Sequence, residues 1–332
     1  METFEFMPSS GQLTWTFGGV EAISRLRPGT TLRLWTEDAF SGLLHKSSHL
    51  PGERIRNGRF NPQTGPFHVE GAEPGDTLVL HIAELTPARD WGVSTLVAGF
   101  GGLTSTDRTA TLQDPLPERT WIYQVDPDSE TIRFEAAAGE FTVDLPLRPM
   151  LGTVGVAPQG GEVRSSLAAD AHGGNLDTPE LRAGATCYLG VNVDGALFSV
   201  GDGHYRQGEG ESCGTAVEGA MNATLVVDLI KGGAPAWPRI ENDDYLITLG
   251  CARPLEDAWR VSQVQMVHWL SELHGLDPLD AYQLLSQISR TPLANVVDTN
   301  YTVATKAPKA LLPDRPGYGG VHRRMREIAA RR

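Results

Sequence analysis

The sequence predicts an α+β protein that is rich in β-structure, with a strand-dominated sandwich or barrel-like core and C-terminal helices packed on it. Up to about residue 250, many segments alternate apolar and polar residues, which is the pattern of half-buried strands. After Pro254, apolar residues recur at three- and four-residue intervals instead, which indicates amphipathic helix. We expect one unit over residues 1–332, strand-rich over about 1–250 and helical over about 255–290.

The clearest strand signals are four alternating runs, at residues 31–35, 76–82, 141–145 and 244–249. Between such runs lie segments rich in glycine and proline, among them residues 74–76, 158–161 and 231–235. Glycine and proline favour the backbone conformations of turns, so we expect the chain to reverse direction at these segments. Most of the chain before Pro254 is therefore predicted to be β-structure.

Two helices are predicted after the strands. The apolar stripe of the first consists of Trp259, Met266, Trp269, Leu270 and Leu273. This spacing predicts a helix from about residue 255 to 274, with Gly275 as its C-cap. In the second helix, Asp277 is the expected N-cap and Pro278 stands at the first helical position. We expect both helices to cover a sheet.

Charge and cysteine content exclude several classes of partner. The formal net charge is -13, which repels phosphate backbones and anionic lipids, so neither nucleic acid nor a membrane is expected to bind. The start of the chain lacks the pattern of a secretory signal, and no apolar run approaches the ~20 residues of a membrane span. Cys187, Cys213 and Cys251 have no CxxC spacing, so neither a disulfide framework nor a thiolate zinc site is indicated. A cytoplasmic protein acting on a small neutral molecule is expected.

The densest group of potential ligands lies at residues 201–211, after an apolar run. If the strand continues through Asp202, its carboxylate and the imidazole of His204 project from the same face and can hold one cation or one substrate. Interleaved glycines allow positive φ, which suits a loop close to a ligand more than a plain strand. The alternative is a glycine-rich hairpin turn whose polar residues are merely solvated.

A second group lies at residues 170–177, where His172 stands among carboxylates and paired glycines. It contains Asn175 and Asp177, which are candidates for catalytic roles. Asparagine and aspartate also favour turns for local hydrogen-bonding reasons, so a loop with His172 exposed is an equal alternative.

Two earlier segments add candidates. Residues 36–42 end an alternating strand with two adjacent carboxylates, Glu37 and Asp38, of which one is expected to face a pocket. In residues 61–76 most of the sequence is typical of a turn that enters a strand, and only Asn61 and Thr64 suggest a function.

Four motifs together resemble the acetamidase/formamidase family in wording and order. They are NPQTGPFHVEGAEPGD, RPMLGTVGVAP, HGGNLD and GALFSVGDGHYRQGEGE, the last followed by TAVE. The resemblance implies a β-rich α+β architecture and homo-oligomers, dimers or higher. It also implies hydrolysis of formamide, acetamide or related short linear amides to a carboxylate and ammonia, with no organic cofactor.

The sequence departs from the family pattern at Tyr205, where alanine is common, and at Glu209, where aspartate is common. Tyr205 adds bulk beside the candidate site and is expected to narrow the acyl pocket. Glu209 keeps the charge but lengthens the side chain by one methylene. These two positions are therefore expected to affect specificity, and short aliphatic amides are expected to be preferred.

Amide hydrolysis requires an activated nucleophile, an oxyanion stabiliser and an acid for the departing ammonia. No Gly-x-Ser-x-Gly motif occurs, and no cysteine stands in a catalytic-looking motif. We therefore expect water activated by a divalent cation, zinc by expectation and calcium as the alternative. The expected metal ligands are Asp38, His172, Asp202 and His204.

The remaining candidates are given catalytic roles. Glu211 or Glu218 is expected to move the proton, and Asp177 is a further catalytic carboxylate. Asn175 and the main-chain N–H groups of the Gly173–Gly174 turn are expected to bind the oxyanion. The rival hypotheses are a hydrolase of a different C–N compound and a non-catalytic β-rich protein that binds a metal or metabolite. Ammonia release from short amides discriminates between an enzyme and a binding protein.

Overall fold

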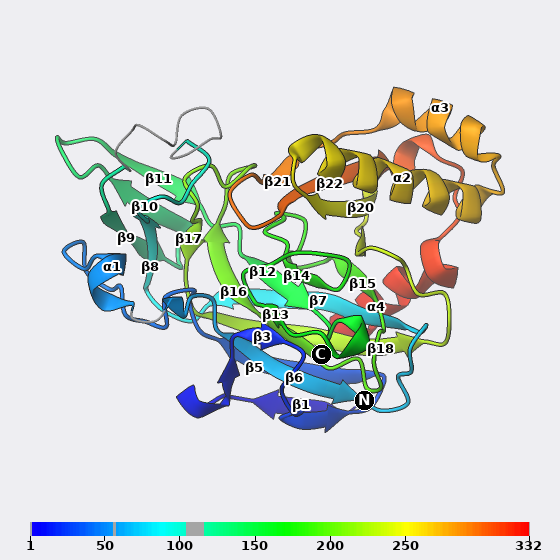
Figure 1. The fold of residues 1–332 in the computed structure, drawn as a ribbon, viewed down its shortest axis with the longest axis horizontal. Coiled ribbons are helices and arrows are strands. Elements are labelled where there is room, and N and C mark those ends of the chain that lie inside the picture. Colours follow the sequence, from blue (N-terminus) through cyan, green and yellow to red (C-terminus); the bar gives the residue numbers. More distant parts are fainter. Residues whose placement is uncertain (1, 56–57, 104–115, 332) are drawn as a thin grey trace.

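The computed structural model describes residues 2–55, 58–103 and 116–331 (Figure 1). Most strands fall into a nine-stranded and an eleven-stranded sheet. The four alternating runs lie in β5 (Thr30–Thr36), β7 (Thr77–Pro87), β11 (Thr142–Pro146) and β20 (Tyr245–Ala252). The predicted α+β, strand-rich fold class with C-terminal helices on the sheets is confirmed.

The nine-stranded sheet is antiparallel except for the pairing of its first two strands. In spatial order its strands are β1 (Thr3–Phe6), β5 (Thr30–Thr36), β18 (Met221–Ile230), β7 (Thr77–Pro87), β15 (Thr186–Gly190), β19 (Arg239–Glu241), β20 (Tyr245–Ala252), β22 (Tyr301–Pro308) and β21 (Leu293–Asn295). Strand β18 pairs along ten residues with β7, so long hydrogen-bonded ladders form the middle of this sheet.

The eleven-stranded sheet carries the candidate ligands. Its main path is β11 (Thr142–Pro146), β10 (Thr131–Glu135), β9 (Arg119–Asp126), β8 (Trp91–Leu96), β17 (Val217–Glu218), β16 (Phe198–Arg206), β12 (Met150–Gly155) and β14 (Gly173–Asn175). Beside β16 lies β6 (Gln63–Val69), which also pairs with β2 (Leu13–Thr14) and β4 (Ser24–Leu26). Strands β3 (Thr16–Phe17) and β13 (Arg164–Ser165) form a separate small sheet.

The main core lies between the two large sheets. Leu80 of β7 and Leu225 of β18 belong to the same buried cluster as Leu151 of β12 and Phe198 of β16. Each side chain is at most 1% exposed. Burial of one such side chain stabilises the fold by roughly 1.5–3 kcal/mol. The apolar residues of the predicted strands thus join the two sheets in a sandwich-like arrangement.

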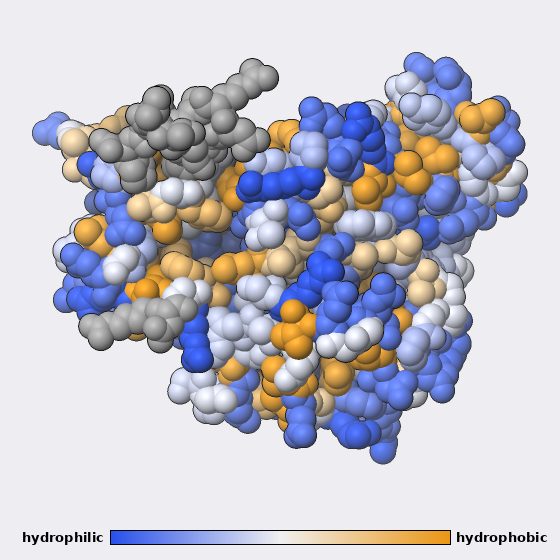
Figure 2. All heavy atoms as spheres, in the orientation of Figure 1, coloured by the Kyte–Doolittle hydropathy of each residue, from blue (hydrophilic) through white to orange (hydrophobic). Residues whose placement is uncertain are grey.

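Helices α2 (Leu255–His274) and α3 (Pro278–Ile288) cover β20 and β22, as predicted (Figure 1). Gly275 ends α2 in the left-handed conformation with φ 66°, and the Asp277 side chain accepts a hydrogen bond from the Leu279 amide at 2.8 Å. Figure 2 shows hydrophilic and hydrophobic residues mixed on the surface over these helices. Among the described residues, no helix combines the length and the apolar character needed to cross a bilayer.

Trp259 does not join the apolar stripe in which it was expected. A β-carbon on Gly250 would lie 2.2 Å from the main-chain oxygen of Ala258 and 2.5 Å from the nitrogen of Ser262, so α2 lies directly on the β20 backbone. Only small side chains fit between the helix and this strand. Ala258 and Ser262 fill that space, and Trp259 remains 43% exposed.

The other helical segments are short or lie near the C-terminal end. They are α1 (Pro51–Arg54), α4 (Val321–Ala330) and the 3₁₀ turns Ser10–Gln12, Gln159–Gly161, Lys309–Leu311 and Gly317–Gly320. Val321 and Met325 of α4 pack with Tyr188 and Val226, so this helix covers part of the nine-stranded sheet.

Candidate active site

Strand β16 continues through Asp202 and His204, and the two side chains lie on one face with Nε2 of His204 3.4 Å from Oδ1 of Asp202. Gly201 and Gly203, which alternate with them, belong to the strand, although a loop was expected. A β-carbon on Gly201 would lie 2.7 Å from the Gln63 amide, and one on Gly203 would lie 2.5 Å from the Gly219 oxygen. These glycines therefore permit tight packing on the opposite face of β16.

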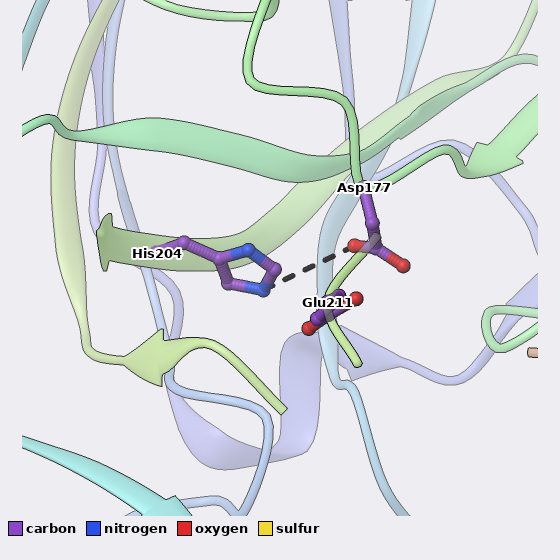
Figure 3. Close-up of side chains that lie close together, drawn as sticks. All are labelled: Asp177, His204 and Glu211. Carbon is purple, nitrogen blue, oxygen red and sulfur yellow. Dashed lines mark ion pairs between the residues drawn. The ribbon is translucent and has the colours of Figure 1, made fainter. Parts of the chain in front are cut away.

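Three more carboxylates lie near His204. Glu218, its register partner on β17, places Oε2 3.1 Å from Nε2, and Oδ1 of Asp177 lies 4.0 Å from the same nitrogen. Figure 3 shows Asp177 and His204 pointing toward each other with Glu211 beside them. The described residues thus contain two groups able to hold a cation, Asp202–His204–Glu218 and Asp177–His204–Glu211. Within each group the ligand atoms lie within 4.8 Å of one another.

Gly152 of β12 forms the floor beneath these groups. A β-carbon at this position would lie 2.5 Å from Oδ1 of Asp177, 2.5 Å from Oδ2 of Asp202 and 2.9 Å from Cε1 of His204. Real β-carbons do not approach other atoms so closely, so only glycine lets the carboxylates pack against the strand. The contribution of the RPMLGTVGVAP motif to the site is therefore Gly152, whose lack of a side chain leaves room for the carboxylates.

Asn61 binds side chains from three strands. Its Nδ2 lies 2.9 Å from Oγ1 of Thr153, 2.6 Å from Oδ1 of Asn175 and 3.3 Å from Oδ2 of Asp202. Nε2 of Gln63 donates to Oδ1 of Asn61 at 2.6 Å. Because Asn61 is 2% exposed, this network is desolvated and holds the Asp202 carboxylate in a defined orientation.

Asn175 orients carboxylates in this structure, whereas a role at the oxyanion was expected. Its Nδ2 donates to Oδ2 of Asp177 at 2.8 Å and to Oδ2 of Asp298 at 2.9 Å, so both amide hydrogens are occupied. The N–H of Gly173 is also occupied, because it donates to the Asp170 oxygen at 2.9 Å.

His172 lies outside both groups, although it was expected among the ligands. Its neighbours Asp170 and Gly173 exchange two hydrogen bonds of 2.9 Å in a tight turn, and His172 lines a different cavity from the one that His204 lines. Its ring packs edge-on against Phe17, with 5.3 Å between centroids. Burial lowers the pKa of His172 to about 4.

Asp38 is also outside both groups, in contrast to its expected role as a ligand. Its carboxylate pairs with Arg89 and accepts hydrogen bonds from the amides of Phe40 at 2.8 Å and Gly42 at 3.0 Å. These donors occupy its oxygens. Asp38 therefore shapes the 38–42 turn, which carries Phe40 into the wall of the cavity.

Tyr205 lies outside the cavity, contrary to the expectation that it narrows an acyl pocket. Side chains alternate along β16, so Tyr205 faces away from His204. Its ring is fully buried against Gly219, and its hydroxyl donates to the Ala220 oxygen at 2.8 Å. Glu209 is exposed and does not line the cavity.

Two functional residues were missed in the sequence. Asp298, in the loop after β21, joins the carboxylates through Asn175, but no histidine or glycine motif in its segment suggests a site. Gln207 follows β16 and places Oε1 2.9 Å from Nδ1 of His204. The sequence shows that Gln207 stands three residues after His204. It does not show that the two side chains meet, because the direction of the Gln207 side chain depends on tertiary packing.

The cavity above these residues has a volume of about 270 Å³. Its floor carries five buried carboxylates, those of Asp177, Asp202, Glu211, Glu218 and Asp298. The described residues that line it include no lysine or arginine. This concentration of acidic groups needs protons or a cation, because like charges at short range in a desolvated site repel strongly.

Burial is the main cause of the perturbed pKa values in this cavity. It raises the pKa values of Asp177 and Glu211 well above their usual range, that of Glu218 to about 7 and that of Asp298 to about 6. For His204, burial opposes protonation, but Glu218 and Asp202 outweigh it and raise its pKa well above the usual value.

Comparison with known proteins places the chain among amidases. A model of the acetamidase/formamidase family matches residues 16–168 and 160–308. An acetamidase from Mycolicibacterium smegmatis is 28% identical over 290 residues, which cover 72% of this chain and 70% of that protein. A formamidase from Methylophilus methylotrophus is 26% identical over 257 residues, covering 65% and 63%.

Solved structures give the same result. The crystal structure of an acetamidase from Yersinia enterocolitica has a TM-score of 0.87 and 37% identity, and the match covers 94% of this chain and 93% of that one. An acetamidase from Bacillus halodurans has a TM-score of 0.82 and 28% identity, with 93% and 98% covered.

Proposed function

The chain belongs to the acetamidase/formamidase family and is an amidohydrolase, and we propose that it hydrolyses a linear amide to a carboxylate and ammonia in the cavity above Gly152. The observation that carries this assignment is the convergence of five buried carboxylates and one histidine on the floor of one cavity. Formamide and acetamide are the smallest linear amides that this proposed function includes.

The donor set supports a divalent cation at the floor. Oδ1 of Asp177 is buried without a hydrogen-bond partner among the described residues, and the one cationic group beside Oε2 of Glu218 is the His204 ring at 3.1 Å. A desolvated carboxylate oxygen without a partner is costly unless a cation or proton neutralises it. Mixed carboxylate oxygen and imidazole nitrogen donors suit zinc, whereas calcium takes oxygen ligands alone. We therefore propose zinc held by His204 with Asp202 and Glu218, or by His204 with Asp177 and Glu211.

A bound zinc ion would supply a water molecule of lowered pKa and polarise the amide carbonyl. The protein supplies the remaining functions. Oε1 of Glu218 accepts a hydrogen bond from the Ala216 amide at 2.8 Å, which fixes the side chain and leaves Oε2 in the cavity. Whichever of Glu211 and Glu218 does not bind the cation is placed to carry a proton from water to the departing ammonia.

Ammonia release from formamide, acetamide and propionamide tests this function. The protein is treated with chelator, shown by elemental analysis to be free of divalent metal, and assayed before and after zinc is added. We expect turnover only after addition. Full activity of the metal-free protein would refute the proposed cation, and absence of turnover with every amide and metal would refute amide hydrolysis.

A further inference from the structure

The cavity also has apolar side chains in its lining that take no part in the chemistry described above. This apolar wall comes from separate parts of the chain, namely Phe40, Phe60, Val97, Phe100 and Leu167, beside which Thr215 and Thr299 also line the cavity. Phe60, Phe100 and Leu167 are only partly buried, so each has apolar surface left to cover. A small polar amide such as formamide leaves most of this wall in contact with water.

Packing holds the wall in place. The rings of Phe40 and Phe60 meet edge to face, with 6.2 Å between centroids and an interplanar angle of 84°. Phe100 lies against Gly214, where an added β-carbon would be 2.6 Å from its ring. The Gly102 amide donates to the Ser212 oxygen at 2.9 Å and ties the Phe100 segment to the opposite loop. The pocket is thus largely preformed, as small-molecule sites usually are.

The wall is connected directly to the catalytic floor. The main-chain N–H of Asn61 donates to the main-chain oxygen of Ala39 at 2.8 Å, which joins the segments that carry Phe40 and Phe60. The Asn61 side chain contacts the Asp202 carboxylate, so this junction lies beside the catalytic floor. A molecule whose carboxamide lies on the floor therefore extends its acyl group against these rings.

Size and charge define what fits. The cavity volume is about 270 Å³, whereas an engineered apolar cavity of about 150 Å³ already binds benzene. A phenyl-sized group and a carboxamide fit together in the larger space. The acidic floor repels anionic groups, and no lysine or arginine lines the described part of the cavity to pair with one. The acyl group that suits this wall is therefore apolar and uncharged.

We propose that the preferred substrate is a primary amide whose acyl group is apolar and about as large as phenylacetyl. This inference rests on the proposed function and specifies its substrate class. The C–N bond of the amide breaks and a C–O bond forms with water, giving the carboxylate and ammonia, which takes up a proton. Acetamide fits the same floor but leaves the wall uncovered.

Specificity constants of the zinc-loaded protein for acetamide, butyramide, benzamide and phenylacetamide test the proposal. Burial of a phenyl-sized group predicts a kcat/KM for phenylacetamide about 10-fold to 100-fold higher than for acetamide. Equal or lower values for phenylacetamide would overturn the inferred acyl group and leave amide hydrolysis intact. Absence of hydrolysis for all four compounds would count against the proposed function instead.

Binding gives a readout that does not depend on turnover. Calorimetry with phenylacetamide and acetamide is done on the metal-free protein. Tighter binding of phenylacetamide supports the apolar pocket even if no reaction occurs. Equal binding of the two amides, or binding of neither, overturns it.

Leu167→Trp fills the pocket from its wall, and Leu311→Trp is the matched control at a position that is 62% exposed and outside the cavity. Crowding should lower phenylacetamide kcat/KM by about 10-fold relative to that of acetamide in Leu167→Trp. The control should keep the wild-type ratio. The same ratio in both variants and the wild type would place the acyl group elsewhere.

Discussion

Oε1 of Gln207 accepts a hydrogen bond from Nδ1 of His204, because the Gln207 amide nitrogen already donates to the main-chain oxygens of Asp177 at 2.6 Å and Ala294 at 2.9 Å. Nδ1 therefore carries a hydrogen, and Nε2 is the nitrogen that faces Glu218 and Asp202. This is the arrangement that directs a histidine toward a cation, with its second nitrogen held by a neighbouring polar group.

Gln207→Leu should weaken zinc binding about 10-fold to 100-fold and lower kcat/KM with it, because the ring of His204 loses its acceptor. Gln207→Glu keeps an acceptor and should retain more of the zinc affinity. Competition with a chromophoric chelator measures the affinity. Wild-type affinity in Gln207→Leu would show that His204 needs no such support.

Gly152→Ala should lower kcat/KM by about 100-fold, because the new β-carbon displaces Asp177 and Asp202 from positions 2.5 Å away. The matched control is Gly208→Ala, since no atom lies within 4 Å of a β-carbon at that position. Steady-state kinetics on both variants, with thermal melting as the folding control, decides the outcome. Comparable rates for the two variants would contradict a tight floor.

His172 should make the protein less stable in mild acid. Burial lowers its pKa to about 4, below the value in the unfolded chain, so the unfolded state binds more protons between pH 6.5 and 4. Stability therefore falls as pH falls through this range, by about 2 kcal/mol from this residue at pH 5.

The measurement for His172 is urea unfolding at pH 7.5 and pH 5 for the wild type and His172→Gln. Other titrating groups are common to both proteins, so the difference between the two pH dependences reports on His172. The variant should lose less stability on acidification. Identical losses would mean that His172 is protonated at little cost in the folded protein.

Tyr205→Phe should leave the ratio of kcat/KM between long and short amides unchanged, because Tyr205 faces away from the cavity. It should destabilise the fold by about 1–3 kcal/mol, since the buried Ala220 oxygen loses the hydroxyl that donates to it at 2.8 Å. The amide panel and denaturant unfolding give the two values. A changed ratio with unchanged stability would reverse the assignment.

Local signals predicted four strands and two helices. Asp277 caps α3 and Gly275 ends α2 in the structure because capping depends on residues within one turn. Alternation likewise placed β5, β7, β11 and β20. The pairing of Asp202 with His204 was also predictable, since residues two apart on a strand share a face.

The composition of the site depended on tertiary structure. Asp298 joins Asp177 from 121 positions along the chain through Asn175, and no local pattern records such a contact. Asp38 and His172 have suitable chemistry, but Asp38 is paired with Arg89, and His172 lines a different cavity. Sequence alone thus determined the four alternating strands, the helices α2 and α3 and the residue types that carry chemistry. Only the packing of the two sheets decided which of those side chains meet, because ligand geometry depends on distances between segments remote in sequence.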